Sequence, residues 1–352
     1  MRRVILGAVL LILACGGAAT LPAPSQATPA RAAAAAPTAT IDVSDMMGAF
    51  PAATFFVVTD DGVKAIALLN HATKYTIPTS GPWGAVQVAV GDGQLYVADE
   101  TAGATRLRWV DPASGTVLAT HTEPGRRLFL TGIGRGSLTV EPTTRRVLAL
   151  FTAENDRRVV EAFEPYDLRP LGQRLEASCG DRVLAAADRV VLPCFAQGAL
   201  VIKDNAGEPR TVSAGIGALV AAAISGDGTT LVGRDDGTLS RIPLTSTTSE
   251  KIEPFRPARL VADGIASPDP QSFAIALETS DLDLAVSETR SGRRYLSFPR
   301  KDTPFGGLLA QGQFAFWSVG SAARHIDLFQ GFAETMATFS GTTRALPGGV
   351  GQ

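Results

Sequence analysis

The sequence predicts an all-β protein, a β-propeller made of four-stranded antiparallel blades. Three observations lead to this fold class. The 352 residues include 36 glycines and 22 prolines but only 7% aromatic residues, a composition typical of folds with many turns. Short runs of alternating hydrophobic residues recur along most of the chain, and one turn motif returns at a regular spacing.

The clearest unit of this pattern runs from Ile77 to Thr120. It contains four predicted strands, and a Gly-Asp-Gly hairpin turn at 91–93 joins the first two. A second turn, Asp111–Gly115, joins the last two strands. One such meander cannot bury both of its faces, so it must stack on neighbours of the same kind.

The turn after the third strand sets the period of the repeat. Comparable turns end at Gly115, Gly207 and Gly292, which are 92 and 85 residues apart. Two units in each interval correspond to a period of roughly 40–47 residues, the length of a four-stranded propeller blade. We count a seven-bladed propeller over residues 41–341, with six or eight blades as alternatives, and expect a flexible tail at 342–352.

The first 40 residues are expected to serve export rather than folding. Residues 1–15 read as a signal peptide, with Arg2 and Arg3 ahead of an apolar run too short to span a bilayer. The run ends at Cys15 in a segment that resembles the lipobox of bacterial lipoproteins, which implies that Cys15 is lipidated. Ordinary cleavage near Ala19, giving a secreted protein, is the alternative. Residues 16–40, rich in Ala, Pro and Thr, read as a disordered tether.

The other two cysteines favour an oxidising compartment. Residues 183–187 and 189–194 form a predicted hairpin that would bring Cys179 close to Cys194. We therefore expect a disulfide between them, with two buried free thiols as the alternative.

One stretch resembles a known family. The run from Pro78 to Ala85, the Gly-Asp-Gly turn, Leu95–Asp99 and Val110–Gly115 together resemble the surface-layer (YVTN-type) propeller repeat, which bacterial YncE-like proteins also carry. The match is good over one blade and degenerate elsewhere. It implies a seven-bladed, exported propeller, but the superfamily includes enzymes and binding proteins, so it implies little about activity.

No motif in the chain points to a catalytic residue, a metal site or a cofactor. The three histidines fall in different units, and there is no HExxH, no paired-cysteine zinc spacing and no G-x-S-x-G. We expect a cell-surface or periplasmic binding or scaffold module for a protein, peptide or glycan. The alternatives are a propeller enzyme of the lactonase or quinoprotein type, or a subunit of a larger envelope complex.

The net charge gives no case for nucleic acid. It is −2 for the whole chain and −4 once Arg2 and Arg3 are removed with the signal. Contact with a membrane is expected only through the lipid anchor.

One set of residues is a candidate binding site. All of them lie in connections that lead into the first strand of a blade, and such connections gather around one mouth of a propeller. An arginine-lined mouth would suit carboxylates or phosphates. The alternative is that these cations pair with local acids such as Glu123, Glu253 and Asp302. The candidates are Trp83, Arg126, Arg127, Arg256, Arg259, Arg300 and Lys301.

Overall fold

The structure is a computed structural model. It describes residues 54–68, 70–81, 85–129, 136–204, 207–252, 259–267, 275–279, 283–288, 294–299, 305–311, 314–327, 332–339 and 346–351. The described residues form β-strands and one short 3-10 helix, η2 (Glu154–Asp156). No helix among them is long and apolar enough to cross a membrane.

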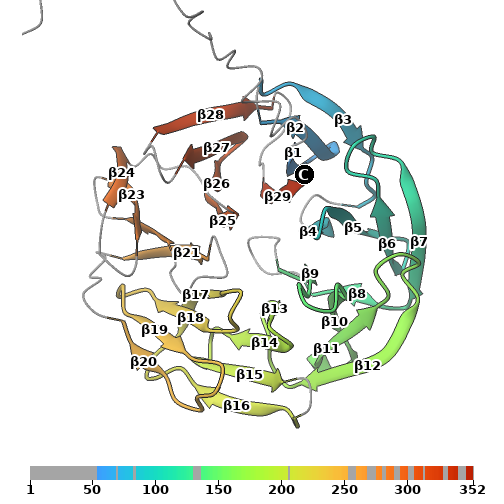
Figure 1. Ribbon diagram of the computed structural model, residues 1–352. Helices are drawn as coiled ribbons and strands as arrows, with labels where there is room; N and C mark the ends of the chain where they lie inside the picture. Colours follow the sequence, from blue (N-terminus) through green and yellow to red (C-terminus); the bar gives the residue numbers. More distant parts are fainter. Residues whose placement is uncertain are drawn as a thin grey trace, which may run out of the picture. The chain divides into compact units, whose positions relative to one another are not determined.

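The strands form seven antiparallel sheets, which are arranged as a ring in Figure 1. We number these blades in chain order. The first blade contains β29 (Leu346–Gly351), β1 (Thr54–Thr59), β2 (Gly62–Ala67) and β3 (Thr73–Ile77). The second contains β4 (Gln87–Gly91), β5 (Gln94–Thr101), β6 (Ala104–Val110) and β7 (Val117–Pro124). The third contains β8 (Arg127–Leu128), β9 (Leu138–Val140), β10 (Val147–Thr152), β11 (Arg158–Phe163) and β12 (Pro170–Ala177).

The remaining four sheets have four strands each. The fourth contains β13 (Leu184–Ala186), β14 (Arg189–Cys194), β15 (Ala199–Asp204) and β16 (Arg210–Ser213). The fifth contains β17 (Leu219–Ile224), β18 (Thr230–Arg234), β19 (Leu239–Ile242) and β20 (Glu250–Lys251). The sixth contains β21 (Leu260–Ala266), β22 (Ile275–Thr279), β23 (Asp283–Glu288) and β24 (Arg294–Pro299). The seventh contains β25 (Phe305–Gln311), β26 (Phe314–Val319), β27 (Ala322–Asp327) and β28 (Phe332–Thr338).

The innermost strands close the ring. Each contacts the innermost strands of the two neighbouring sheets, in the order β29, β4, β9, β13, β17, β21, β25 and back to β29. The predicted all-β propeller of four-stranded antiparallel blades is therefore confirmed.

The prediction of a flexible tail at 342–352 is wrong for residues 346–351, which form strand β29. Strand β29 pairs antiparallel with β1, with Val350 opposite Phe55. All six residues of β1 are buried, and its inner edge would hold unpaired N–H and C=O groups without β29. The sequence hid this strand because Leu346–Gly351 is rich in Gly and Pro, which are uncommon in strands.

Apolar side chains fill the space between adjacent blades. Between the second and third blades, Tyr96 and Leu107 pack in one cluster with Phe151 and Phe163. A separate cluster between the third and fourth blades includes Leu148, Val160 and Leu192. These interfaces join strands that are distant in the sequence, and burial of this apolar area stabilises the ring.

Hydrogen bonds to the turn after the third strand also tie neighbouring blades together. Tyr75 Oη on β3 donates to the Pro112 carbonyl of the second blade at 2.5 Å. Tyr96 Oη on β5 donates to the Pro165 carbonyl of the third blade at 2.8 Å. Burial, with a smaller contribution from Asp111, raises the pKa of Tyr75 to about 12, so this hydroxyl keeps its proton near neutral pH.

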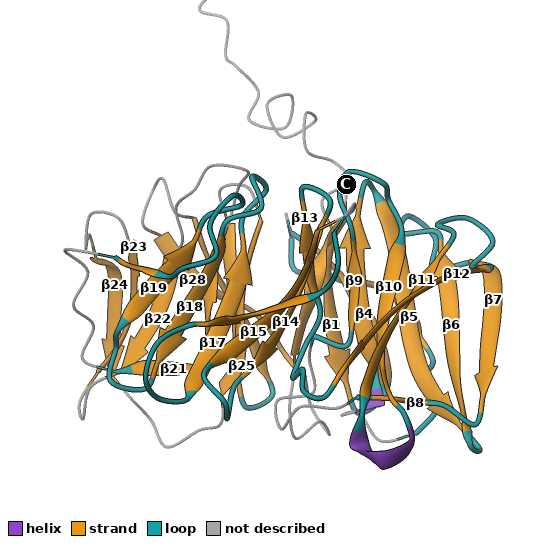
Figure 2. Cartoon of the chain, turned by 90° about the horizontal axis from the view of Figure 1, so that it is seen from below, coloured by secondary structure: helices purple, strands orange, loops and turns teal. Residues whose placement is uncertain are grey.

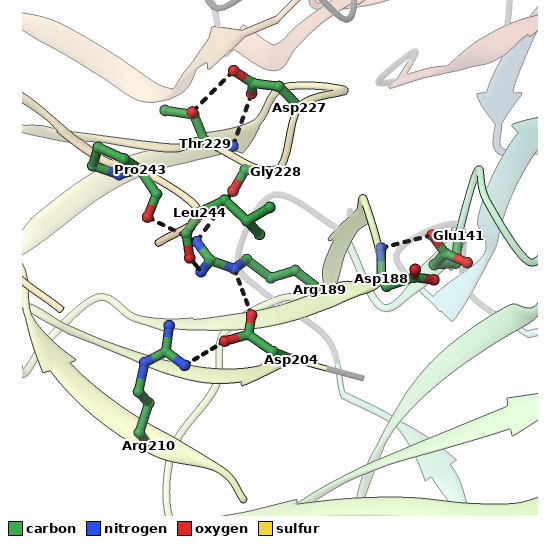
Figure 3. Close-up of polar contacts among 10 residues, drawn as sticks. All are labelled: Glu141, Asp188, Arg189, Asp204, Arg210, Asp227, Gly228, Thr229, Pro243 and Leu244. Carbon is green, nitrogen blue, oxygen red and sulfur yellow. Dashed lines mark hydrogen bonds and ion pairs between the residues drawn. The ribbon is translucent and has the colours of Figure 1, made fainter. Parts of the chain in front are cut away.

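The fourth blade uses an arginine to reach the same turn of the fifth (Figure 3). Arg189 on β14 is fully buried, and its Nη1 donates to the carbonyls of Gly228 at 3.2 Å and Pro243 at 3.3 Å. Its Nη2 donates to the Leu244 carbonyl, and its Nε donates to Asp204 Oδ1 at 2.8 Å. One guanidinium thus joins β14, β15 and two turns of the fifth blade.

Asp204 completes this group. It also accepts a hydrogen bond from Arg210, which is about one-third exposed. Burial raises the pKa of Asp204, but the hydrogen bonds from Arg189 and Arg210 outweigh burial and bring this pKa below its usual value. At the turn between β13 and β14, the backbone N–H of Asp188 lies 3.4 Å from Glu141 Oε1 of the third blade (Figure 3).

The structure contains the expected disulfide between Cys179 and Cys194, whose Cα atoms are 5.5 Å apart. Cys179 lies in the connection that follows β12, and Cys194 is the last residue of β14. The bond therefore ties the third blade to the fourth.

Candidate functional site

A groove of about 800 Å³ lies at one end of the third blade. Its walls come from four segments: residues 124–127 at the entry to β8, residues 151–155 at the end of β10 and in η2, residues 157–159 at the start of β11, and residues 174–176 of β12. Figure 2 shows β8 and η2 at this same end of the blade. Four arginines line the groove: Arg126, Arg127, Arg157 and Arg174.

A buried carboxylate organises two of these arginines. Glu161 on β11 is only 3% exposed and accepts hydrogen bonds from Arg126 Nη1 and from Arg174 Nε, the latter at 3.2 Å. Arg126 also lies over the Phe151 ring, 5.8 Å from its centroid. A buried carboxylate must be paired to remain charged, so Glu161 holds both guanidinium groups at the floor and edge of the groove.

The other two arginines lie nearer the solvent. Arg157 Nη2 pairs with Glu176 Oε2 at 3.1 Å, and both side chains are about half exposed. Arg127 is exposed, and in the part of the chain that the structure describes it has neither an ion pair nor a side-chain hydrogen bond. The lining arginines outnumber the lining acids, Glu154 and Glu176, so the groove favours an anionic ligand.

The structure separates the cations that the sequence grouped together. Arg126 and Arg127 belong to the third blade and Arg259 to the entry of the sixth, so two blades lie between them. Arg126 is tied to Glu161, and Arg259 pairs with Asp235 at 2.6 Å on an exposed surface. Of these three predicted cations, only Arg127 is left without an acidic partner among the described residues. Four candidates lie outside the described residues: Trp83, Arg256, Arg300 and Lys301.

Sequence reasoning missed Arg157, Arg174 and Glu161, which complete the groove. Arg174 and Glu176 alternate with buried Leu175 and Ala177 along β12, a pattern that was readable in the sequence. That Glu161 faces Arg126, 35 residues away, depends on how the segment before β8 packs against β11 in the third blade, and no local pattern encodes it.

The histidines offer no further site of this kind. His71 and His325 come from opposite ends of the chain, and the ring brings their imidazoles to 5.9 Å between centroids. Among the described residues, no three His, Cys, Asp or Glu side chains are grouped so that they could hold a metal ion.

Comparison with known proteins supports the fold alone. No family model matches the sequence, and no curated protein matches it. The structure is similar to that of U3-55K, with a TM-score of 0.57 and 13% identity over 84% of this chain and 92% of that chain. It is similar to the WD40 repeats of RRP9, with a TM-score of 0.56 and 14% identity over 77% and 84% of the two chains.

The β-propeller domain of Cps50 (Swd1) from Myceliophteria thermophila is also similar, with a TM-score of 0.53 and 13% identity over 78% of this chain and 90% of that one. At such low identity these similarities establish a WD40-like β-propeller. Because 1118 solved chains match, the fold itself selects no function.

Proposed function

We propose that this protein is a non-catalytic binding module whose groove on the third blade receives a carboxylate-rich segment of a protein partner. The observation that carries the proposal is the set of four arginines around one hollow of about 800 Å³, three of them held in place by acids and one unpaired among the described residues. Arginine binds carboxylates in a planar, two-pronged geometry, which makes it the residue suited to such a partner.

The geometry of the groove fits binding better than chemistry. Glu176, which lines the groove, and Glu161, which lies behind two of its arginines, are engaged by arginines and so are poorly placed to take up a proton from a substrate. Glu154, the other lining acid, is exposed on η2. The acids that hold the arginines come from two neighbouring strands of one sheet, β11 and β12. A preformed surface of this kind lowers the ordering cost of binding.

The prediction for this site concerns Arg127. Changing Arg127 to Glu is expected to weaken the binding of a ten-residue poly-glutamate peptide roughly fivefold or more, about 1 kcal/mol for an exposed charge pair. The loss should shrink as the salt concentration rises past about 0.15 M, because salt screens exposed charges. Fluorescence anisotropy with labelled peptide measures both effects.

The matched control is Arg241→Glu. Arg241 is also an exposed arginine on a strand, but it lies on the fifth blade and pairs with Glu250. This variant should bind poly-glutamate as the unchanged protein does. Equal losses from both variants would show that only the net charge of the protein matters, and the groove would then not be the binding site.

The proposal extends to the place where the module acts. We propose that the chain is a YVTN-type propeller that is exported and held at the cell envelope by a lipid on Cys15. Cys15 lies outside the described residues. The Cys179–Cys194 disulfide supports export, because disulfides persist in oxidising compartments and are rare in the cytosol. A secreted form without the lipid is the alternative.

Changing Cys15 to Ser is expected to abolish incorporation of a clickable fatty acid and to move the protein from the membrane fraction to the soluble fraction. The lipid would be attached to the cysteine sulfur through a thioether, which a serine hydroxyl cannot form. The Cys179→Ala/Cys194→Ala variant keeps Cys15 and should remain labelled. Unlabelled wild-type protein in the culture medium would favour the secreted form instead.

A further inference from the structure

A second hollow, with a volume of about 330 Å³, lies where the third blade meets the fourth. Its floor is apolar: Leu148, Val160, Ala162 and Leu175 are each at most 4% exposed. The floor belongs to the hydrophobic cluster that joins the two blades. Its volume is at the lower end of the range for ligand sites and suits one large aliphatic side chain with its neighbours.

The rim of this hollow carries cations that are not neutralised. Arg146 is held by neutral groups, with Nη1 2.5 Å from Gln173 Oε1 and Nε 2.7 Å from Thr144 Oγ1. Lys203 Nζ donates to the Gly207 carbonyl at 3.3 Å. Neither has an ion pair among the described residues, unlike most arginines of the third blade.

Asp188 is the acid on this rim, and it lines the hollow with Arg146, Lys203 and Arg174. The rim is therefore positive overall, above an apolar floor. Charge complementarity calls for a ligand that carries both carboxylates and an aliphatic group.

A free strand edge borders the same hollow. β12 is the outermost strand of its sheet and, in the described part of the chain, pairs only with β11. Its sole proline, Pro170, is its first residue, so the remainder of the edge keeps its N–H groups. Gln173 and Leu175 on β12 line the hollow directly.

We propose that this edge and hollow together form a second binding site, for an extended acidic peptide that adds to β12 as a further strand. Backbone hydrogen bonds to β12 would hold the peptide, and side chains on one face of it would point toward the hollow. An aliphatic side chain fills the apolar floor, and the flanking carboxylates face Arg146 and Lys203. The site does not include Arg127, and Arg174 is the one lining residue that it shares with the arginine groove.

The test uses the full chain and a fluorescein-labelled nine-residue peptide in which aspartate and leucine alternate. Binding is expected to weaken at least about tenfold in the Arg146→Glu/Lys203→Glu variant, because two attractive contacts become repulsive. Two further peptides carry methyl groups on alternate backbone nitrogens, one on the odd and one on the even positions. At least one of them should bind comparably weakly, because methylation removes the N–H donors that strand addition needs. Replacing the leucines of the peptide by alanine should weaken binding as well.

Two controls separate this site from the arginine groove. Arg127→Glu should leave the binding of the alternating peptide unchanged, and Arg146→Glu/Lys203→Glu should leave poly-glutamate binding unchanged. Thermal unfolding of each variant shows whether it is folded.

Three results would overturn the proposal. One is a lack of binding by the alternating peptide, and another is unaltered binding by the folded double variant. The third is equal binding of both methylated peptides together with competition by octanoate. That result would assign the hollow to small aliphatic carboxylates and exclude strand addition.

Discussion

Changing Arg189 to Met is expected to lower the free energy of unfolding by about 3–5 kcal/mol, the largest single-residue effect that we foresee. Methionine fills much of the space of the arginine stem but donates no hydrogen bond. The carbonyls of Gly228 and Pro243 lose their donor, and the buried one, Gly228, has no access to water in exchange. For a domain of this size the loss corresponds to a fall in Tm of roughly 5–15 °C.

Arg210→Met is the matched control, since Arg210 binds the same carboxylate of Asp204 from a partly exposed position. A partly exposed ion pair contributes at most about 1 kcal/mol, so this variant should unfold close to the unchanged protein. Chemical denaturation followed by circular dichroism measures both. If the free energy of unfolding falls equally in the two variants, the hydrogen bonds from Arg189 to the carbonyls of the fifth blade do not contribute to stability.

The difference between these two arginines shows what the sequence leaves open. The turn that begins at Pro243 follows the third strand of its blade. Turns in this place could be located in other blades because Gly, Pro and Asp have strong local preferences. The donor to the Pro243 carbonyl comes from another blade, 54 residues away in sequence. Which residue reaches it depends on how two sheets pack, and in other blades that residue is a tyrosine.

The second blade was predictable for the same local reason. The Gly-Asp-Gly signal corresponds to a turn between β4 and β5 in which Asp92 and Gly93 both have positive φ, 51° and 69°. The closing strand β29 was not predictable, because Pro347 and its glycines are poor strand formers that are ordered by the free edge of β1.

In the candidate site, too, only the features that depend on local sequence were predictable. Arg127 could be singled out from its place at the entry of a blade, a position that the repeat defines. The sequence did not show whether a cation at such a position has an acidic partner. Arg126 pairs with Glu161 of β11, and Arg259 pairs with Asp235, which follows β18. These partners are set by packing between strands and loops, so the position of the connection was predictable and its charge was not.

Removing the disulfide with Cys179→Ala/Cys194→Ala is expected to lower the free energy of unfolding by about 3 kcal/mol, the chain-entropy value for a loop of the 15-residue separation found here. Alanine is chosen because Cys194 is fully buried, and a serine hydroxyl there would add its own desolvation cost. A reducing agent should destabilise the unchanged protein by a similar amount and leave the variant as it is. Thermal unfolding with and without reductant measures this difference.

The same variant connects the fold to the second binding site. The disulfide links the connection after β12 to β14, and these two strands supply Leu175 and Val190 to the hollow between the third and fourth blades. Without it, the walls of the hollow lose their covalent link and keep apolar packing and hydrogen bonds such as that of Asp188 to Glu141, so the alternating Asp–Leu peptide should bind more weakly. Poly-glutamate binding at the arginine groove, whose walls all belong to the third blade or its entry, should be unchanged. Equal weakening of both ligands would show that the disulfide stabilises the blade as a whole and does not shape the hollow.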